Sequence, residues 1–104
     1  MKITDIKIFP EKKTADVWDA VTDTEVVNST GEDITAHLVT RLIDVNENVV
    51  GKTETDFTVK VDSKVLVRQS VLTYSPVLSE KYVMSCTLIA NSAELDKKSA
   101  VLTF

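Results

Sequence analysis

The sequence is poor in the residues from which covalent links, metal sites and catalytic centres are usually built. Its 104 residues include one cysteine, Cys86, and one histidine, His37. A single cysteine cannot form an internal disulfide, and these two residues cannot supply the Cys and His ligands that a zinc site needs. We therefore expect a fold that is held together by its hydrophobic core alone.

Glycine, proline and long apolar runs are also scarce. Two glycines and two prolines leave little room for a flexible linker. No apolar run approaches the roughly 20 residues that span a bilayer, and the amino terminus lacks the apolar stretch of a signal peptide. We expect a soluble domain whose compartment stays open, with a periplasmic or extracellular location favoured over a cytoplasmic one.

The charge balance argues against two classes of partner. Lys and Arg number 12 against 16 Asp and Glu, a formal net charge of -4, so a nucleic-acid backbone or an anionic membrane would repel the chain. Apolar residues make up 43% and charged residues 27%, which is an ordinary globular balance. Because this length suffices for one core and not for two, residues 1–104 are expected to form a single domain.

Val, Ile and Thr alternate with polar residues at a period of two along most of the chain, and no segment has a helical period. Turn-forming residues separate the alternating segments, which is typical of an all-β fold. The pattern predicts an immunoglobulin-like sandwich of about seven antiparallel strands in two sheets. The expected strands are 3–9, 14–28, 34–43, 49–61, 64–72, 81–90 and 100–104, with Pro10 ending the first and a polar loop over 91–98.

The second and third of these strands are amphipathic. Trp18 shares a face with Ala20 and Val26, which predicts a core tryptophan, whereas Asp19, Asp23 and Glu25 share the opposite, solvent-facing side. In the third strand Ile34, Ala36, Leu38, Thr40 and Leu42 are expected inside, and His37 and Arg41 outside.

No residue is assigned a catalytic, cofactor-binding or metal-binding role. His37 is expected on the outer face of its strand, and Cys86 lies in the most apolar segment, where a buried thiol is inert. The acidic residues fall on predicted solvent faces and turns rather than in a cleft. We expect no cofactor and no small-molecule ligand.

Three short patterns have a functional and a structural interpretation. Asp44, Asn46 and Asn48 alternate as in the first half of a calcium loop, but the turn glycine and bidentate glutamate are missing, which favours a hairpin turn. Asn28-Ser29-Thr30 matches the glycosylation acceptor pattern or is a plain turn. Trp18, Tyr74 and Tyr82 could stack on sugars, although Trp18 and Tyr82 are better explained as core residues.

Several segments resemble the immunoglobulin-like domain of family 2 glycoside hydrolases, the β-galactosidase and β-glucuronidase group. A long strand ends in an Asn turn at Glu25-Val26-Val27-Asn28, and a hairpin follows over 38–48. The segment 76–82, Pro-Val-Leu-Ser-Glu-Lys-Tyr, is similar to the family's Pro-x-Leu-Trp-Ser segment and its following Pro-x-Leu-Tyr strand start. The tryptophan and second proline are missing and Asn48 replaces a turn glycine, which suits a divergent or carboxy-terminal copy of the domain.

The resemblance implies a non-catalytic scaffold. In such enzymes this domain supports the barrel and carries neither catalytic glutamate, so the implied partners are neighbouring domains of a parent enzyme. The alternative function is that of a free-standing extracellular binding or adhesion module of the fibronectin or bacterial surface type.

Overall fold

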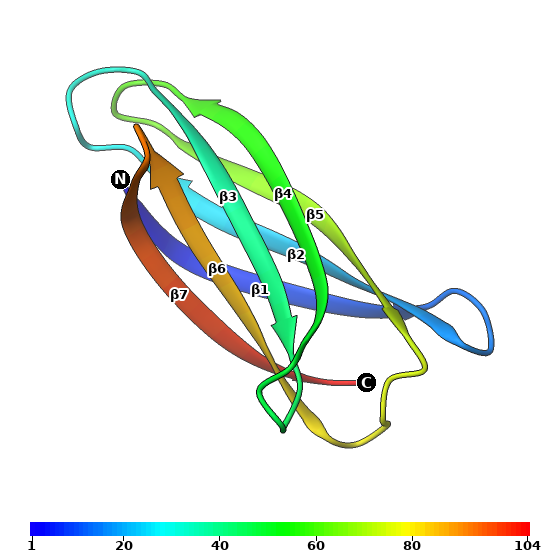
Figure 1. The fold of residues 1–104 in the computed structure, drawn as a ribbon. Coiled ribbons are helices and arrows are strands. Elements are labelled where there is room, and N and C mark those ends of the chain that lie inside the picture. The colour runs from blue at the N-terminus through cyan, green and yellow to red at the C-terminus, as the bar shows by residue number, and fades with distance from the viewer.

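Strands account for most of the chain. The computed structural model describes all residues 1–104 and contains seven strands and no helix (Figure 1), as the sequence predicted. No helical segment that could cross a membrane is present. The strands are β1 (Lys2–Lys12), β2 (Val17–Val27), β3 (Ile34–Ile43), β4 (Val49–Val59), β5 (Lys64–Tyr74), β6 (Lys81–Ala90) and β7 (Ala93–Thr103).

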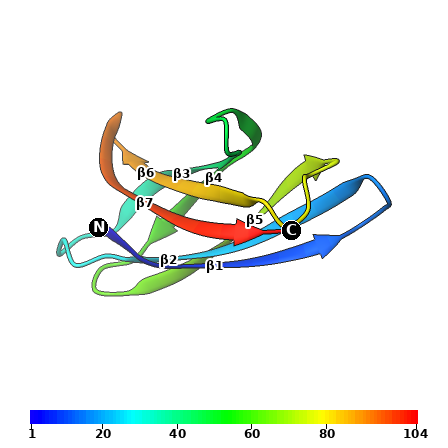
Figure 2. The same ribbon diagram turned by 90° about the horizontal axis from the view of Figure 1, so that it is seen from below.

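The strands form two antiparallel sheets that pack face to face (Figure 2). The three-stranded sheet has the order β1-β2-β5 and the four-stranded sheet the order β4-β3-β6-β7. This arrangement confirms the predicted immunoglobulin-like sandwich, and β6 is a central strand as expected.

The two termini lie at opposite ends of the elongated sandwich (Figure 1), which measures 46 × 24 × 18 Å. One end, here called the Met1 end, carries the connections 28–33, 60–63 and 91–92. The other, here called the Phe104 end, carries the connections 13–16, 44–48 and 75–80.

One cluster of 15 buried residues fills the space between the sheets. Its members come from alternate positions of the strands, because successive side chains point to opposite faces of a sheet. Fully buried members include Ala20 and Val26 of β2, Leu38 and Leu42 of β3, Val71 of β5, and Met84, Cys86 and Leu88 of β6.

A buried glutamine connects the two sheets. Gln69 of β5 is 4% exposed, and its Nε2 donates to the carbonyl oxygen of Leu38 at 3.2 Å and to Thr55 Oγ1 at 3.1 Å. Its Oε1 accepts a hydrogen bond from Thr40 Oγ1 at 2.5 Å. Because both ends of the amide are bonded, this polar side chain is compatible with the core and fixes β5 against β3 and β4.

Aromatic side chains close the core at the Phe104 end. Tyr82, at the start of β6, is 5% exposed, and its hydroxyl accepts a hydrogen bond from the Val77 amide at 2.9 Å. This is the position of the tyrosine corner of immunoglobulin-like sandwiches. Phe104 packs edge-on against both Tyr82 and Trp18, with ring centroids 5.1 and 5.7 Å apart. Trp18 is thus on the inner face as expected, although it is half-buried.

The predicted polar loop over 91–98 is wrong. Asn91 and Ser92 alone form the turn, with φ angles of 52° and 61°, and β7 begins at Ala93. Two successive positive φ angles match the strand twist of a tight hairpin. The segment has a polar sequence because β7 is an edge strand and most of its side chains are exposed.

The bounds of the first two strands also differ from the expected ones. β1 continues through Pro10 to Lys12, because an edge strand has a neighbour on one side only and tolerates a residue without an N–H. β2 begins at Val17 rather than at Thr14. The Thr14 hydroxyl oxygen accepts hydrogen bonds from the amides of Asp16 and Val17, which makes a local turn there.

Replacing Gln69 by alanine is expected to lower the free energy of unfolding by about 2–4 kcal/mol, because it removes packing and leaves buried polar groups of β3 unpaired. Urea denaturation measures the change. The matched control Thr35→Ala removes an exposed hydrogen bond to Thr58 and should cost less than about 0.5 kcal/mol. Equal small losses for both variants would contradict the role assigned to Gln69.

Candidate functional site

His37 lies on the outer face of the four-stranded sheet, as expected. Its Nδ1 is 2.5 Å from Asp56 Oδ1 and its Nε2 is 3.1 Å from Glu54 Oε1, both carboxylates belonging to the neighbouring strand β4. The hydrogen bonds with Asp56 and Glu54 raise the pKa of His37 above its ordinary value, against the smaller effect of burial. With both ring nitrogens engaged and no nucleophile among these partners, the cluster is a surface ion-pair group.

Cys86 is fully buried in β6 between the two sheets. Burial raises the pKa of its thiol, and contacts with the hydroxyls of Thr40 at 3.6 Å and Thr24 at 3.7 Å oppose this effect only in part. A protonated thiol without solvent access is a poor nucleophile, so Cys86 acts as a core residue.

The connection 44–48 is a hairpin turn, as predicted. Asp44 Oδ1 accepts hydrogen bonds from the amides of Asn46 and Asn48, both at 2.9 Å, and Glu47 adopts a positive φ of 65°. One Asp44 oxygen is therefore bonded to the turn itself. No group of three or more His, Cys, Asp or Glu residues is placed to hold a metal ion.

Asn28 is a structural residue at the Met1 end. Its side chain is 1% exposed, and its Nδ2 donates to the carbonyl oxygens of Glu32 and Val59 at 2.7 and 3.0 Å. Its Oδ1 accepts hydrogen bonds from the amide and the hydroxyl of Thr30. A buried amide with these partners is inaccessible to a glycosylating enzyme in the folded chain, so the segment 28–30 is a turn.

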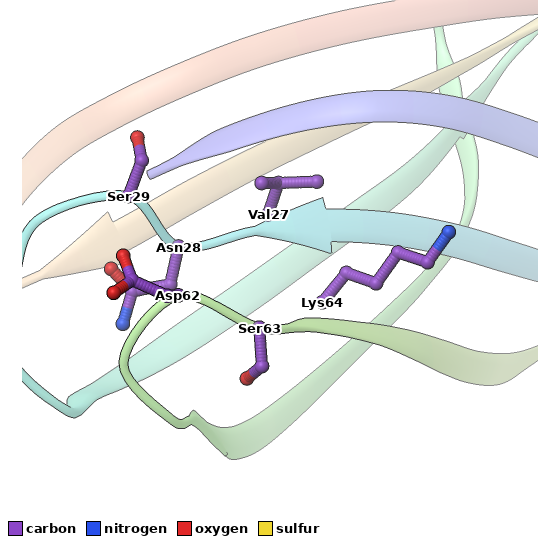
Figure 3. A pocket seen from close by; sticks show the side chains of 6 residues that line it. All are labelled: Val27, Asn28, Ser29, Asp62, Ser63 and Lys64. Carbon is purple, nitrogen blue, oxygen red and sulfur yellow. The ribbon is translucent and has the colours of Figure 1, made fainter.

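The surface has one hollow, with a volume of about 420 Å³, beside Asn28 at the Met1 end (Figure 3). Its two sides are joined by the Asn28 amide, which donates to the Ser63 carbonyl oxygen at 2.9 Å. Its wall holds one apolar residue and two serines, but neither serine hydroxyl is hydrogen-bonded to Asp62 or Lys64. The Ser63 hydroxyl donates instead to the Lys60 carbonyl oxygen at 2.7 Å, so the hollow contains no activated nucleophile. The lining residues are Val27, Asn28, Ser29, Asp62, Ser63 and Lys64.

Apolar side chains are concentrated on the surface of the Phe104 half. Twelve large hydrophobic residues are exposed, ten aliphatic and two aromatic. The strand registers and the positions of the connections place nine of them in the half nearer Phe104. These nine are Phe9, Val45, Val49, Val50, Leu72, Tyr74, Val77, Leu78 and Val101.

On the four-stranded sheet this apolar surface is a row that crosses all four strands. The register aligns Val49 of β4, Ile43 of β3, Val83 of β6 and Val101 of β7. Val49 and Val101, at the two ends of the row, are 54% and 63% exposed. An aliphatic surface without a row of aromatics is suited to contact with protein rather than to stacking on sugars.

Asp19 lies on the outer face of its strand, as the sequence pattern predicts, but it is buried there rather than exposed to solvent, with 6% of its surface accessible. The signal was available, because Val17 and Val21, which flank Asp19 on the same face of β2, are apolar.

No protein-family model matches the chain, and no curated protein matches its sequence. The fold does match solved structures. A β-glucuronidase from glycoside hydrolase family 2 has a TM-score of 0.93 at 18% identity, covering 99% of this chain and 12% of that chain. A family 2 member from Bacteroides cellulosilyticus has a TM-score of 0.91 at 17% identity, covering 98% and 14%. A putative β-galactosidase from Bacteroides fragilis has a TM-score of 0.90 at 16% identity, covering 99% and 17%.

These matches confirm the resemblance seen in the sequence at the level of the fold. The chain has the fold of a sandwich domain found in family 2 glycoside hydrolase structures. It spans less than a fifth of the length of each of these proteins.

The His37 cluster predicts a specific pH dependence. The NMR titration midpoint of the His37 ring should lie above 6.5, because both carboxylates favour the protonated ring. The stabilisation is fully present below pH 6.5 and is lost as the pH rises through the raised pKa of the folded state. Asp56→Asn should move the midpoint down, whereas the control Asp5→Asn, on the other sheet, should leave it unchanged. A midpoint at or below 6.5 in the wild-type chain would refute the assignment.

Proposed function

We propose that residues 1–104 form a non-catalytic immunoglobulin-like module of a larger carbohydrate-active enzyme similar to family 2 glycoside hydrolases, and that the module supports a neighbouring domain. The proposal rests on how much of each chain the structural matches cover. The matches take in 98–99% of this chain and 12–17% of the matched chains, so the fold occurs in them as one part of a much longer protein.

The chemistry of the chain supports a non-catalytic role. Glycoside hydrolysis in most families needs two carboxyl groups about 5–10 Å apart in a site that binds the sugar. The one hollow of this surface has a single carboxylate in its lining, that of Asp62. His37 has both ring nitrogens bonded, and the Cys86 thiol is buried. In this proposal no residue of the chain takes part in sugar cleavage.

The shape and surface of the sandwich support a scaffolding role. Because the termini lie at opposite ends (Figure 1), adjoining parts of a longer polypeptide would be attached about one sandwich length apart. The aliphatic surface of the Phe104 half is of the kind that packs against another protein surface. In this proposal the Phe104 half is the part of the module that contacts its neighbour.

The complete reading frame around these residues tests the proposal. We expect it to encode a catalytic barrel and a sugar-binding jelly roll in the same polypeptide. A frame that encodes this sandwich with no hydrolase domain would refute the scaffold function and would favour a free-standing binding or adhesion module.

Purified residues 1–104 are expected to hydrolyse neither a fluorogenic β-galactoside nor a fluorogenic β-glucuronide above the buffer rate, because the chain offers no acid and nucleophile in a sugar-binding site. The matched control is the Asp62→Asn variant, which removes the one carboxylate that lines the hollow. Turnover by the wild-type chain that this variant loses would contradict the proposal and would make the hollow an active site.

A further inference from the structure

The dipeptide Asn-Ser occurs twice in the chain, at Asn28-Ser29 and at Asn91-Ser92. An asparagine that precedes a small residue is prone to deamidation, because the amide nitrogen of that next residue can reach the side-chain carbonyl carbon with little steric hindrance. The other two asparagines, Asn46 and Asn48, precede a glutamate and a valine, whose larger side chains hinder this attack. The local sequence thus offers two reactive sites, and the fold distinguishes between them.

The fold blocks the reaction at Asn28. Its side chain is 1% exposed. Its Nδ2 donates to three backbone carbonyl oxygens, and its Oδ1 accepts two hydrogen bonds from Thr30. The carboxamide that would have to move and lose its nitrogen is therefore held in place, and it can react only after this end of the sandwich has opened.

Asn91 is in the opposite situation. Asn91 and Ser92 are both exposed and form the two-residue turn between β6 and β7 at the Met1 end (Figure 1). Neither the Asn91 carboxamide nor the Ser92 amide takes part in a hydrogen bond. No hydrogen bond of either group therefore holds the Ser92 nitrogen away from Asn91 Cγ, and water has free access to both.

We propose that Asn91 is a site of spontaneous deamidation in the folded chain, whereas Asn28 is protected. The Ser92 amide nitrogen loses its proton to solvent and bonds to Asn91 Cγ, the bond from Cγ to Nδ2 breaks, and ammonia leaves. Water then opens the cyclic imide at one or the other of its carbonyl carbons, which gives aspartate or isoaspartate. Water is the only co-reactant, and the modification is independent of the proposed scaffold function.

The modification changes the β6–β7 hairpin. Isoaspartate adds one carbon atom to the backbone of a turn that consists of two residues and pairs Ala90 with Ala93. The two successive positive φ angles of this turn match the twist of the strands, and a longer backbone does not keep that match. Both products also add a negative charge near Glu94 in the sequence. The proposal therefore includes a weaker hairpin after deamidation.

Incubation of the chain in mildly alkaline buffer, followed by tryptic peptide mapping with mass spectrometry, tests the site. The tryptic peptides 82–97 and 14–41 contain Asn91 and Asn28 as their only asparagines, and neither contains glutamine. In the folded chain we expect peptide 82–97 to deamidate about tenfold faster or more, because a buried amide reacts only through local opening. In concentrated urea the two rates should become similar, since the dipeptide is the same.

Two mapping results would overturn the proposal. Equal rates at the two sites in the folded chain, or a faster rate at Asn28, would show that burial and hydrogen bonding do not control the reaction. An Asn91 that stays intact in the folded chain while both sites react in urea would show that the closed turn itself protects it. A sample taken before incubation corrects for deamidation during digestion.

The variant Asn91→Gly separates this reaction from other chemical ageing. Glycine adopts the positive φ of the turn and lacks the carboxamide, so the fresh variant should melt within about 2 °C of the wild-type chain. After incubation the wild-type chain should accept labelled methyl groups from an isoaspartyl methyltransferase, and its Tm should fall by about 4 °C or more. The incubated variant should accept none and keep its Tm.

The remaining outcomes contradict the proposal. Equal methyl acceptance by the two incubated chains would place the isoaspartate at another residue and refute the assignment to Asn91. A wild-type chain that is deamidated at Asn91 and melts like the fresh chain would refute the effect on the hairpin.

Discussion

The hydrogen bonds of Gln69 are the interaction on which the sandwich depends, because the inner faces of its sheets are only partly apolar. Buried polar residues occur on both sides of the core, and most of them have a hydrogen-bond partner within reach, whereas the Thr73 hydroxyl has none. The side-chain amide of Gln69 forms hydrogen bonds with Thr40, Thr55 and the Leu38 carbonyl. The same hydrogen bonds hold β5 of one sheet against β3 and β4 of the other, beside the buried apolar cluster.

The same requirement explains the two ends of the molecule. At the Met1 end the buried side-chain amide of Asn28 donates hydrogen bonds to carbonyl groups in the connections 28–33 and 60–63. At the Phe104 end the Tyr82 hydroxyl accepts a hydrogen bond from the Val77 amide, and the rings of Phe104 and Trp18 cover the core. On the outer surface, Asp19 meets the requirement only in part, because Ser70 donates to its Oδ2 while its buried Oδ1 has no partner.

Most of the fold could be predicted from the sequence because alternation at a period of two is a local property. The segment 34–43 shows this, since its inner residues and the outer position of His37 follow from counting alternate residues. Long-range pairing is not local. Nothing in the sequence indicated that β7 pairs with β6 from a two-residue turn at Asn91 and Ser92, because an edge strand exposes most of its side chains and resembles a loop in composition.

The candidate surface could not be predicted for a related reason. The exposed positions Phe9, Leu72 and Tyr74 are far apart in sequence and become neighbours only through the register of β1, β2 and β5. The neighbours of Asp19 likewise follow from the register, which places Glu11 and Leu72 on either side of it. The expectation that no residue has a catalytic role, in contrast, came only from which residues the chain contains, and it stays a prediction.

The role proposed for this sandwich is to support a neighbouring domain without taking part in that domain's chemistry. A structure of the complete polypeptide with a sugar-derived inhibitor bound tests this claim most directly. The account predicts that the Phe104 half of the sandwich packs on a neighbouring domain and that no side chain of residues 1–104 touches the inhibitor. A sandwich that makes no contact with the other domains, or one that contributes a side chain to the inhibitor site, would contradict it.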